Sequence, residues 1–185
     1  AVIGAGTMGS GIAGQIANAG HKVLLLDLNT EATDYALQRL KKSEPAPLHQ
    51  RCNVDLIKTG TIEDDFDKLA ECDWIVEAIV EQLDVKRNLY RRLDDVISKN
   101  CIVTSNTSTI PIKLLVAEMP TAFQERFAIT HYFNPVRYMR LLELVRGEKT
   151  RSDVMEKLSD FNDEVLGKGV VPCKDTPGFL GNRVG

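Results

Sequence analysis

The chain has 185 residues, of which 43% are hydrophobic and 26% charged, the balance of an ordinary globular protein. Its net charge is −3, and acidic and basic residues are mixed along the chain, so the sequence contains no basic cluster of the kind that binds nucleic acid. No apolar run approaches the roughly 20 residues that a membrane span requires. The four cysteines are scattered, without metal-ligand spacing, so we expect reduced thiols, no metal site and a cytoplasmic location of bacterial type, an organelle being left open.

A glycine-rich turn joins the first predicted strand to the first predicted helix. Ala1-Val2-Ile3 runs into Gly4-x-Gly6-x-x-Gly9, and an Ala/Ile-rich helix follows from about Met8 to Ala19. Glycine lets such a turn close tightly and lets the backbone approach both a ligand and a neighbouring element. The N–H groups of the first helical turn then face an anion. The alternative is a turn that merely closes a strand–helix unit.

A second apolar strand, Lys22 to Asp27, ends on a carboxylate. At this position an aspartate accepts a hydrogen bond from the adenosine ribose 2′-OH and repels a 2′-phosphate, which favours NAD over NADP. Asn29 and Thr30 add no arginine that would soften this preference. The alternative role of Asp27 is to cap the next turn.

Strands and helices alternate along the rest of the chain, and nothing repeats. We expect helices over 30–42, 84–99 and 111–118, and a last one from a Thr150-x-x-Asp153 capping box to Val165. We expect strands over 73–79, 101–105, 127–129, 141–145 and 170–171, and a mobile hairpin or insertion over 43–61. This order predicts an α/β fold, a Rossmann-like doubly wound, mostly parallel sheet flanked by helices, with its ligand at the carboxyl ends of the strands.

Two side chains stand out in the predicted strands of the second half. His131 follows an apolar run, and a half-buried histidine at a strand end is suited to take a proton at neutral pH. Glu143 lies in Leu141-Leu-Glu-Leu-Val145, where a carboxylate is costly to bury without a partner. If the two strands are adjacent, Glu143 orients His131 as in a catalytic dyad. A core histidine and a solvent-facing glutamate on an edge strand are the alternatives. The polar turn Ser105 to Thr109 either meets a ligand or simply forms a turn.

Segments along nearly the whole chain together resemble the NAD-binding domain of L-3-hydroxyacyl-CoA dehydrogenases. They are Gly4-Ala-Gly-Thr-Met-Gly9, Val76-Glu-Ala-Ile-Val-Glu81, Ser105-Asn-Thr-Ser108, His131-Tyr-Phe-Asn-Pro-Val136, Leu142-Glu143, and Lys174-Asp-Thr-Pro-Gly-Phe179 with Asn182-Arg183. The resemblance implies that His131 is the general base and Glu143 its partner, and that Ser108 and Asn182 bind the C3 oxygen of the substrate. It also implies an NAD site formed by Gly4, Gly6, Thr7, Met8, Gly9, Asp27, Ala78, Glu81, Lys86, Ser108 and Asn134. A cap and proline at Thr176-Pro177 mark the start of the helix that carries Asn182.

The resemblance implies oxidation of (3S)-3-hydroxyacyl-CoA to 3-ketoacyl-CoA in fatty-acid β-oxidation. Residues 1–172 then form the NAD-binding domain, and residues 173–185 begin the linker and helix that lead to a helical C-terminal domain, which this chain lacks. We therefore expect weak turnover from this chain alone, and a homodimer or a multifunctional complex for the full-length protein. Residues 43–60 match the CoA-binding arm of the family poorly, so the resemblance assigns no particular CoA-contacting residue there. A related sugar-acid dehydrogenase and a non-catalytic NAD-binding module are the alternatives.

Overall fold

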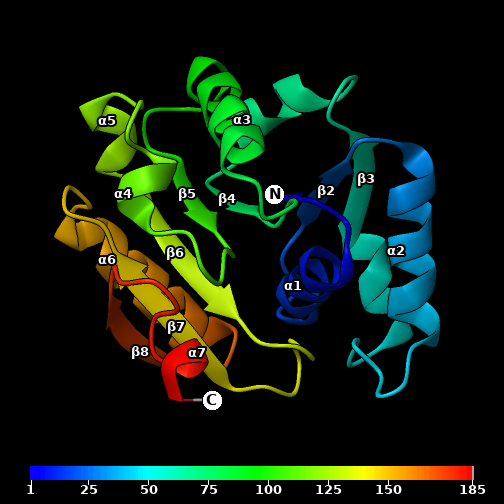
Figure 1. The fold of residues 1–185 in the computed structure, drawn as a ribbon. Coiled ribbons are helices and arrows are strands. Elements are labelled where there is room, and N and C mark those ends of the chain that lie inside the picture. Colours follow the sequence, from blue (N-terminus) through cyan, green and yellow to red (C-terminus); the bar gives the residue numbers. More distant parts are fainter. Residues whose placement is uncertain (185) are drawn as a thin grey trace.

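One eight-stranded sheet organises the computed structural model, which describes residues 1–184 (Figure 1). The strand order is β3-β2-β1-β4-β5-β6-β7-β8, and every pairing is parallel except that of β6 with β7. The strands are β1 (Val2–Ile3), β2 (Val23–Asp27), β3 (Ile57–Thr61), β4 (Trp74–Glu77), β5 (Ile102–Ser105), β6 (Phe127–Tyr132), β7 (Leu141–Arg146) and β8 (Gly169–Lys174). The prediction of a doubly wound, mostly parallel sheet is confirmed. Because β1 lies between β2 and β4, the strand order reverses at β1, where such sheets bind ligands.

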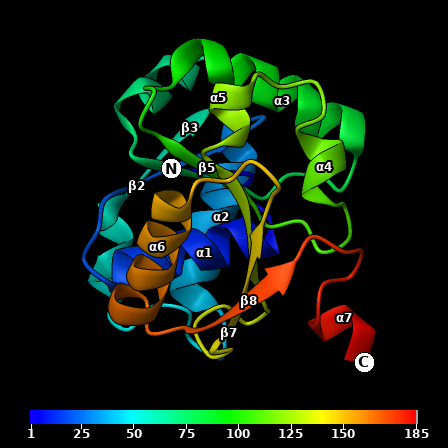
Figure 2. The same cartoon turned by 90° about the vertical axis from the view of Figure 1, so that its left-hand side faces the viewer.

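Helices cover both faces of the sheet (Figures 1 and 2). On one face lie α3 (Leu83–Val96), α4 (Ile112–Leu115) and α5 (Thr121–Gln124), and on the other lie α1 (Thr7–Asn18), α2 (Thr30–Lys42) and α6 (Ser152–Asp160). The shorter elements are the 3-10 helices η1 (Arg51–Leu56) and η2 (Phe66–Glu71), the π-helical turn η3 (Phe161–Val165) that continues α6, and α7 (Gly181–Val184). Successive strand residues pack on opposite faces, as Ile75 and Val76 of β4 do. No helix in the described part of the chain is long and apolar enough to cross a membrane.

The segment over 43–61 contains a strand that the sequence did not predict. Ile57–Thr61 forms β3, which pairs in parallel with β2 at the edge of the sheet, so the expected hairpin is wrong. The stretch before it is held from two sides. Arg137 donates to the carbonyls of Ala46 and Leu48 at 2.7 and 3.0 Å, and the Asn18 amide donates to the carbonyl of Pro47 at 2.9 Å.

Two predicted helix starts are also wrong. The Thr150 hydroxyl donates to the carbonyl of Phe127 instead of capping a helix, and α6 begins at Ser152 after an uncapped Arg151. The last helix begins at Gly181 and not at Thr176-Pro177, because Gly178 and Phe179 have φ values of +79° and +46°. A right-handed helix excludes such values. β8 ends at Lys174, just beyond the predicted domain end at residue 172.

Candidate active site

The three glycines of the first turn are not equivalent, because two are packed against backbone and one faces open space. A Cβ on Gly4, whose φ is +104°, would lie 2.3 Å from the carbonyl oxygen of Ala78, and one on Gly9 would lie 1.7 Å from that of Gly4. Gly4 and Gly9 are therefore required by close backbone packing. A Cβ on Gly6 would meet nothing within 4 Å. Gly6 is also the N-cap of α1 and makes no side-chain cap, so the open side of the turn presents helix N–H groups to an anion.

Asp27, at the end of β2, binds the glycine turn. Its Oδ2 accepts a hydrogen bond from the N–H of Ala5 at 2.6 Å, and its Oδ1 accepts one from the N–H of Leu28 at 2.6 Å. The hydrogen bond from Leu28 shows that Asp27 also caps the next turn, which was the alternative role expected for it. A carboxylate has about four acceptor positions, so it retains the capacity to bind a ribose hydroxyl as well.

His131 and Glu143 face each other across the antiparallel pair β6–β7. They are register partners, and His131 Nδ1 lies 2.6 Å from Glu143 Oε2. Glu143 is fully buried, and β7 is not an edge strand because β8 pairs with it, so the alternative of a solvent-facing residue on an edge strand is excluded. His131 lies inside β6 and is only 7% exposed, more buried than the strand-end position predicted from the sequence.

The other oxygen of Glu143 holds the beginning of α7. Oε1 accepts hydrogen bonds from the N–H groups of Leu180 and Gly181 at 2.9 and 2.6 Å. A Cβ on Gly181 would lie 2.9 Å from the Phe133 ring, which in turn lies 4.5 Å from the His131 ring between centroids. Hydrogen bonds to a carboxylate are strong, and these two bonds prevent it from turning away from the imidazole.

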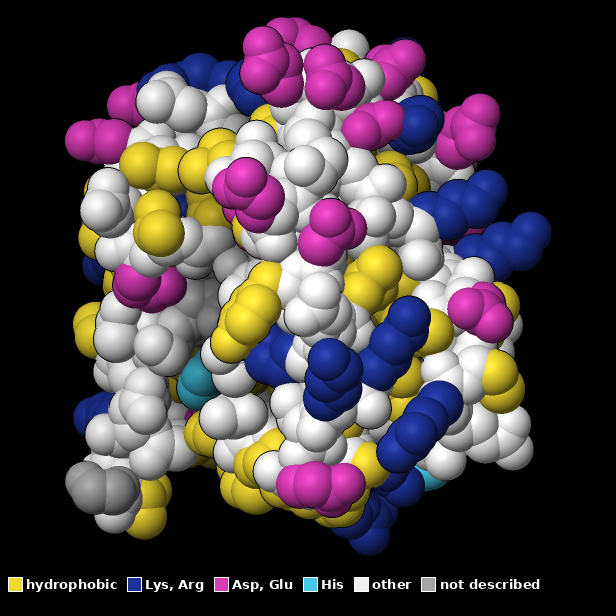
Figure 3. Space-filling view, turned by 90° about the vertical axis from the view of Figure 1, so that its right-hand side faces the viewer, with side chains coloured by type: hydrophobic (Ala, Val, Ile, Leu, Met, Phe, Trp, Pro, Cys, Tyr) yellow, Lys and Arg dark blue, Asp and Glu magenta, His cyan; other side chains and the backbone are white. Residues whose placement is uncertain are grey.

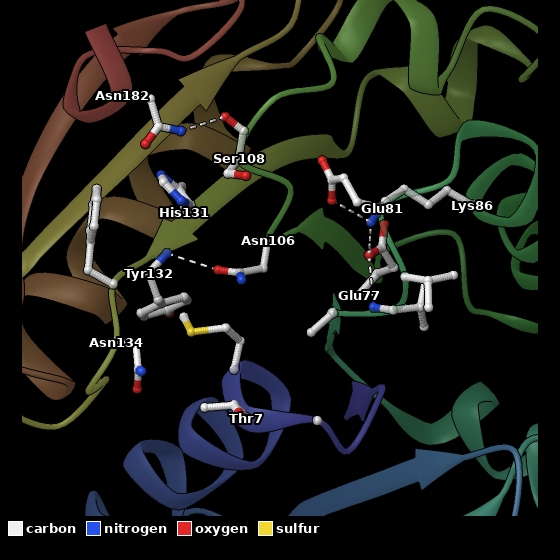
Figure 4. Close-up of a pocket in the computed structure, with 16 residues that line it drawn as sticks. Thr7, Glu77, Glu81, Lys86, Asn106, Ser108, His131, Tyr132, Asn134 and Asn182 are labelled. Carbon is white, nitrogen blue, oxygen red and sulfur yellow. Dashed lines mark hydrogen bonds and ion pairs between the residues drawn. The ribbon is translucent and has the colours of Figure 1, made fainter. Parts of the chain in front are cut away.

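A pocket of about 540 Å³ connects this dyad to the glycine turn (Figure 4). The predicted site residues that line it are Gly6, Thr7, Met8, Ala78, Glu81, Lys86, Ser108, His131, Asn134 and Asn182. Four other predicted site residues do not line this pocket, namely Gly4, Gly9, Asp27 and Glu143. Asn182, in α7, donates from Nδ2 to the carbonyl of Ser108 at 3.1 Å, so the last helix closes one side of the pocket (Figure 4).

Sequence reasoning missed several pocket residues, namely Glu77, Ile79, Val80, Tyr132 and Phe133, and it considered Asn106 only as part of the polar turn. The most informative is Glu77 in β4, which is fully buried and accepts hydrogen bonds from Lys86 and Tyr90 at 2.5 Å each and from Ser105 at 2.9 Å. Burial and the charge of Glu77 raise the pKa of Tyr90 well above its usual value, so its hydroxyl stays a donor. The sequence did contain a signal for Glu77, because this carboxylate ends an apolar strand just as Glu143 interrupts one, and a carboxylate is costly to bury without a partner.

Glu81 lies beside Lys86 on the pocket wall, with 3.6 Å between the carboxylate and the ammonium. Burial alone would raise the pKa of Glu81, but hydrogen bonds from Thr107 and Thr109 and the charge of Lys86 lower it. The polar turn after β5 therefore serves mainly to bind Glu81, and within it Ser108 and Asn106 line the pocket.

A doubly wound sheet with a glycine turn at its switch point defines a dinucleotide-binding domain of the Rossmann type, and a buried histidine–carboxylate pair lies at the far side of its pocket. Comparison with known proteins identifies the family. Residues 1–176 match the family model described as 3-hydroxyacyl-CoA dehydrogenase, NAD binding domain. The chain belongs to this family, which confirms the resemblance and NAD as the cofactor.

The similarity extends over the whole chain but over only part of each relative. The chain is 44% identical over 191 residues to a putative fatty acid oxidation complex trifunctional enzyme of Rickettsia felis, covering 100% of this chain and 26% of that protein. It is 43% identical over 192 residues to a probable 3-hydroxyacyl-CoA dehydrogenase of Deinococcus radiodurans, covering 100% of this chain and 56% of that protein. The crystal structure of 3-hydroxybutyryl-CoA dehydrogenase from Escherichia coli superposes with a TM-score of 0.85 at 36% identity, covering 99% of this chain and 40% of that one.

Proposed function

We propose that the full-length protein oxidises (3S)-3-hydroxyacyl-CoA to 3-ketoacyl-CoA in fatty-acid β-oxidation, with His131 as the general base. The observation that carries this proposal is the buried His131–Glu143 pair in the wall of the pocket that begins at the glycine turn. A histidine and a carboxylate at 2.6 Å form a base and its orienting group, which suits removal of a hydroxyl proton.

Glu143 sets the tautomer of His131. An ionised carboxylate only accepts hydrogen bonds, so His131 Nδ1 carries a proton toward Glu143 and leaves the lone pair of Nε2 for the pocket. Nε2 then takes the proton of the C3 hydroxyl. Glu143 stabilises the positive charge that develops on the imidazole ring, as the aspartate does in serine-protease triads.

The pocket residues suit the pyrophosphate and the nicotinamide end of NAD. Gly6, with open space above it, and the N–H groups of the first turn of α1 suit the pyrophosphate. Glu81, Lys86 and Asn134 are proposed to bind the nicotinamide ribose end. When bound, NAD supplies the acceptor for the C3 hydride. Ser108 and Asn182, which already contact each other, are proposed to orient the C3 oxygen toward His131.

The full-length protein is proposed to act as a homodimer or within a multifunctional complex. The chain spans about a quarter of its Rickettsia relative and just over half of its Deinococcus relative, and the former is named a trifunctional enzyme. The division into residues 1–172 and a linker from 173 onward belongs to the same proposal.

Loss of NADH fluorescence on adding acetoacetyl-CoA to the full-length protein tests the proposed activity. We expect loss with acetoacetyl-CoA and none with CoA alone. Loss with a free 3-keto acid but not with acetoacetyl-CoA would instead indicate a hydroxy-acid dehydrogenase. Binding of NADH without any turnover would indicate a non-catalytic module.

A further inference from the structure

An arginine from α2 reaches the glycine turn. Nη2 of Arg39 donates to the carbonyl of Ala5 at 3.0 Å, and Nη1 donates to the hydroxyl of Thr7 at 3.1 Å. The guanidinium carbon lies 5.2 Å from the centroid of the Tyr35 ring, one helical turn earlier, at a distance suited to a cation–π contact. Sequence analysis did not point to this arginine, because Arg39 lies twelve positions beyond Asp27 along the chain.

Arg39 and Asp27 hold the same residue of the turn. The N–H of Ala5 donates to Asp27, and the carbonyl of Ala5 accepts from Arg39. Since the nitrogen and oxygen of one residue are separated by only three covalent bonds, the carboxylate oxygen and the guanidinium nitrogen lie within about 9 Å of each other. A carboxylate and a guanidinium therefore flank one point of the cofactor site.

The guanidinium is not fully satisfied by the protein. Its Nε is buried, and within the described part of the chain it has no hydrogen-bond partner. Arg39 also lies in a basic last turn of α2 together with Lys41 and Lys42. The face of the molecule that carries α2 shows several Lys and Arg side chains gathered together (Figure 3). The three positive charges in the last turn of α2 favour a phosphate nearby.

We propose that Arg39 is able to bind a 2′-phosphate on the adenosine ribose, so that Asp27 alone excludes that phosphate from the site. This inference rests on the proposed function, which places that ribose against Asp27. A 2′-phosphate there meets the negative charge of Asp27 and is repelled. When that charge is removed, Arg39 offers a positive charge and the second N–H of each Nη to a phosphate, with the guanidinium already oriented by Tyr35 and the turn.

Equilibrium titration of the full-length protein with NADH and with NADPH, followed by nucleotide fluorescence, tests the proposal without reference to turnover. Asp27→Asn keeps an oxygen for the Ala5 N–H and removes the charge. We expect this variant to bind NADPH about tenfold or more tightly than the wild type, the effect of a hydrogen bond to a charged group. The double variant Asp27→Asn/Arg39→Gln should bind NADPH more weakly than Asp27→Asn, because it lacks the donors of Arg39. Asp27→Asn/Arg39→Lys should lie between the two, because lysine keeps the positive charge without the fork.

Arg146 provides a matched control. It also donates to a backbone carbonyl, that of Thr150, and to a side-chain hydroxyl, that of Ser152, each at 3.1 Å, but away from the pocket. Asp27→Asn/Arg146→Gln should therefore keep the full gain in NADPH affinity.

Equal NADPH affinity in Asp27→Asn and Asp27→Asn/Arg39→Gln, with unchanged thermal unfolding midpoints, would overturn the role of Arg39. A different result would contradict the proposed function. If Asp27→Asn leaves the affinities for NADH and NADPH as they are in the wild type, the ribose does not lie against Asp27.

Discussion

Replacing Glu143 by glutamine changes the chemistry of the dyad while nearly preserving its shape. The glutamine oxygen can still accept from Leu180 and Gly181, and the amide nitrogen then stands where Oε2 now lies 2.6 Å from His131 Nδ1. An amide N–H donates, so Nδ1 must accept and the ring proton moves to Nε2. A protonated Nε2 cannot remove a proton from a hydroxyl group.

The expected loss of rate follows from that inverted tautomer and from the lost negative charge. The corresponding change in a serine-protease triad lowers turnover about 10⁴-fold. We therefore expect Glu143→Gln to lower the turnover of 3-hydroxybutyryl-CoA about 10³- to 10⁴-fold, or about 4 to 5.5 kcal/mol of activation free energy. The free energy of unfolding should fall by about 1 to 3 kcal/mol, because the hydrogen bonds to Glu143 lose their charge. NADH affinity should not change, because Glu143 lies outside the pocket lining.

Turnover of the full-length variant is measured from NADH absorbance, and NADH affinity is measured from its fluorescence. The exposed Glu148, in the turn after β7, provides the control, and Glu148→Gln should leave both quantities unchanged. Turnover by Glu143→Gln within tenfold of the wild type would refute the tautomer argument. An equal loss of turnover and NADH affinity would show a structural role for Glu143 instead.

Three further predictions concern the turn, a buried lysine and the extent of the chain. Gly9→Ala should lower both the thermal unfolding midpoint and NADH affinity, whereas Gly6→Ala should leave the midpoint unchanged, because only the former Cβ collides with backbone; equal midpoints would contradict this. Burial lowers the pKa of Lys168 from 10.5 to about 8, so between these values the unfolded chain binds more protons than the folded one. The free energy of unfolding of the wild type should therefore rise relative to that of Lys168→Met as pH rises from about 8 to 10.5, by at most about 1.4 kcal/mol per pH unit. Denaturant titrations measure both free energies, and a difference between them that does not change with pH would exclude the pKa shift. The 185-residue chain alone should bind NADH but oxidise 3-hydroxyacyl-CoA far more slowly than the full-length protein, and equal rates would contradict the need for further sequence.

The parts of the fold that the sequence predicted well are those with a local signal. The strand that ends at Asp27 is a nearly continuous apolar run, as a parallel strand covered on both faces must be. β3 carries no such run, because Ile57-Lys-Thr-Gly-Thr61 lies at the sheet edge, where Lys58 is exposed. The edge position, which only the tertiary structure defines, removes the demand for apolar residues.

The same distinction applies to the site. The cost of burying a carboxylate in an apolar strand pointed to Glu143, and the antiparallel register confirms its pairing with His131. Arg39 and the α7 contacts to Glu143 join residues that are far apart along the chain. No periodicity or spacing encodes such contacts, so they could not be predicted from the sequence.

The first turnover of a His131→Gln variant tests the central claim most directly. Full-length wild type and variant are mixed rapidly with NAD and (3S)-3-hydroxybutyryl-CoA, and NADH absorbance is followed. We predict that NADH forms about 10²- to 10⁴-fold more slowly in the variant, the usual contribution of a general base, while NADH affinity stays that of the wild type. NADH formation by His131→Gln at close to the wild-type rate would contradict the assignment of His131 as the base.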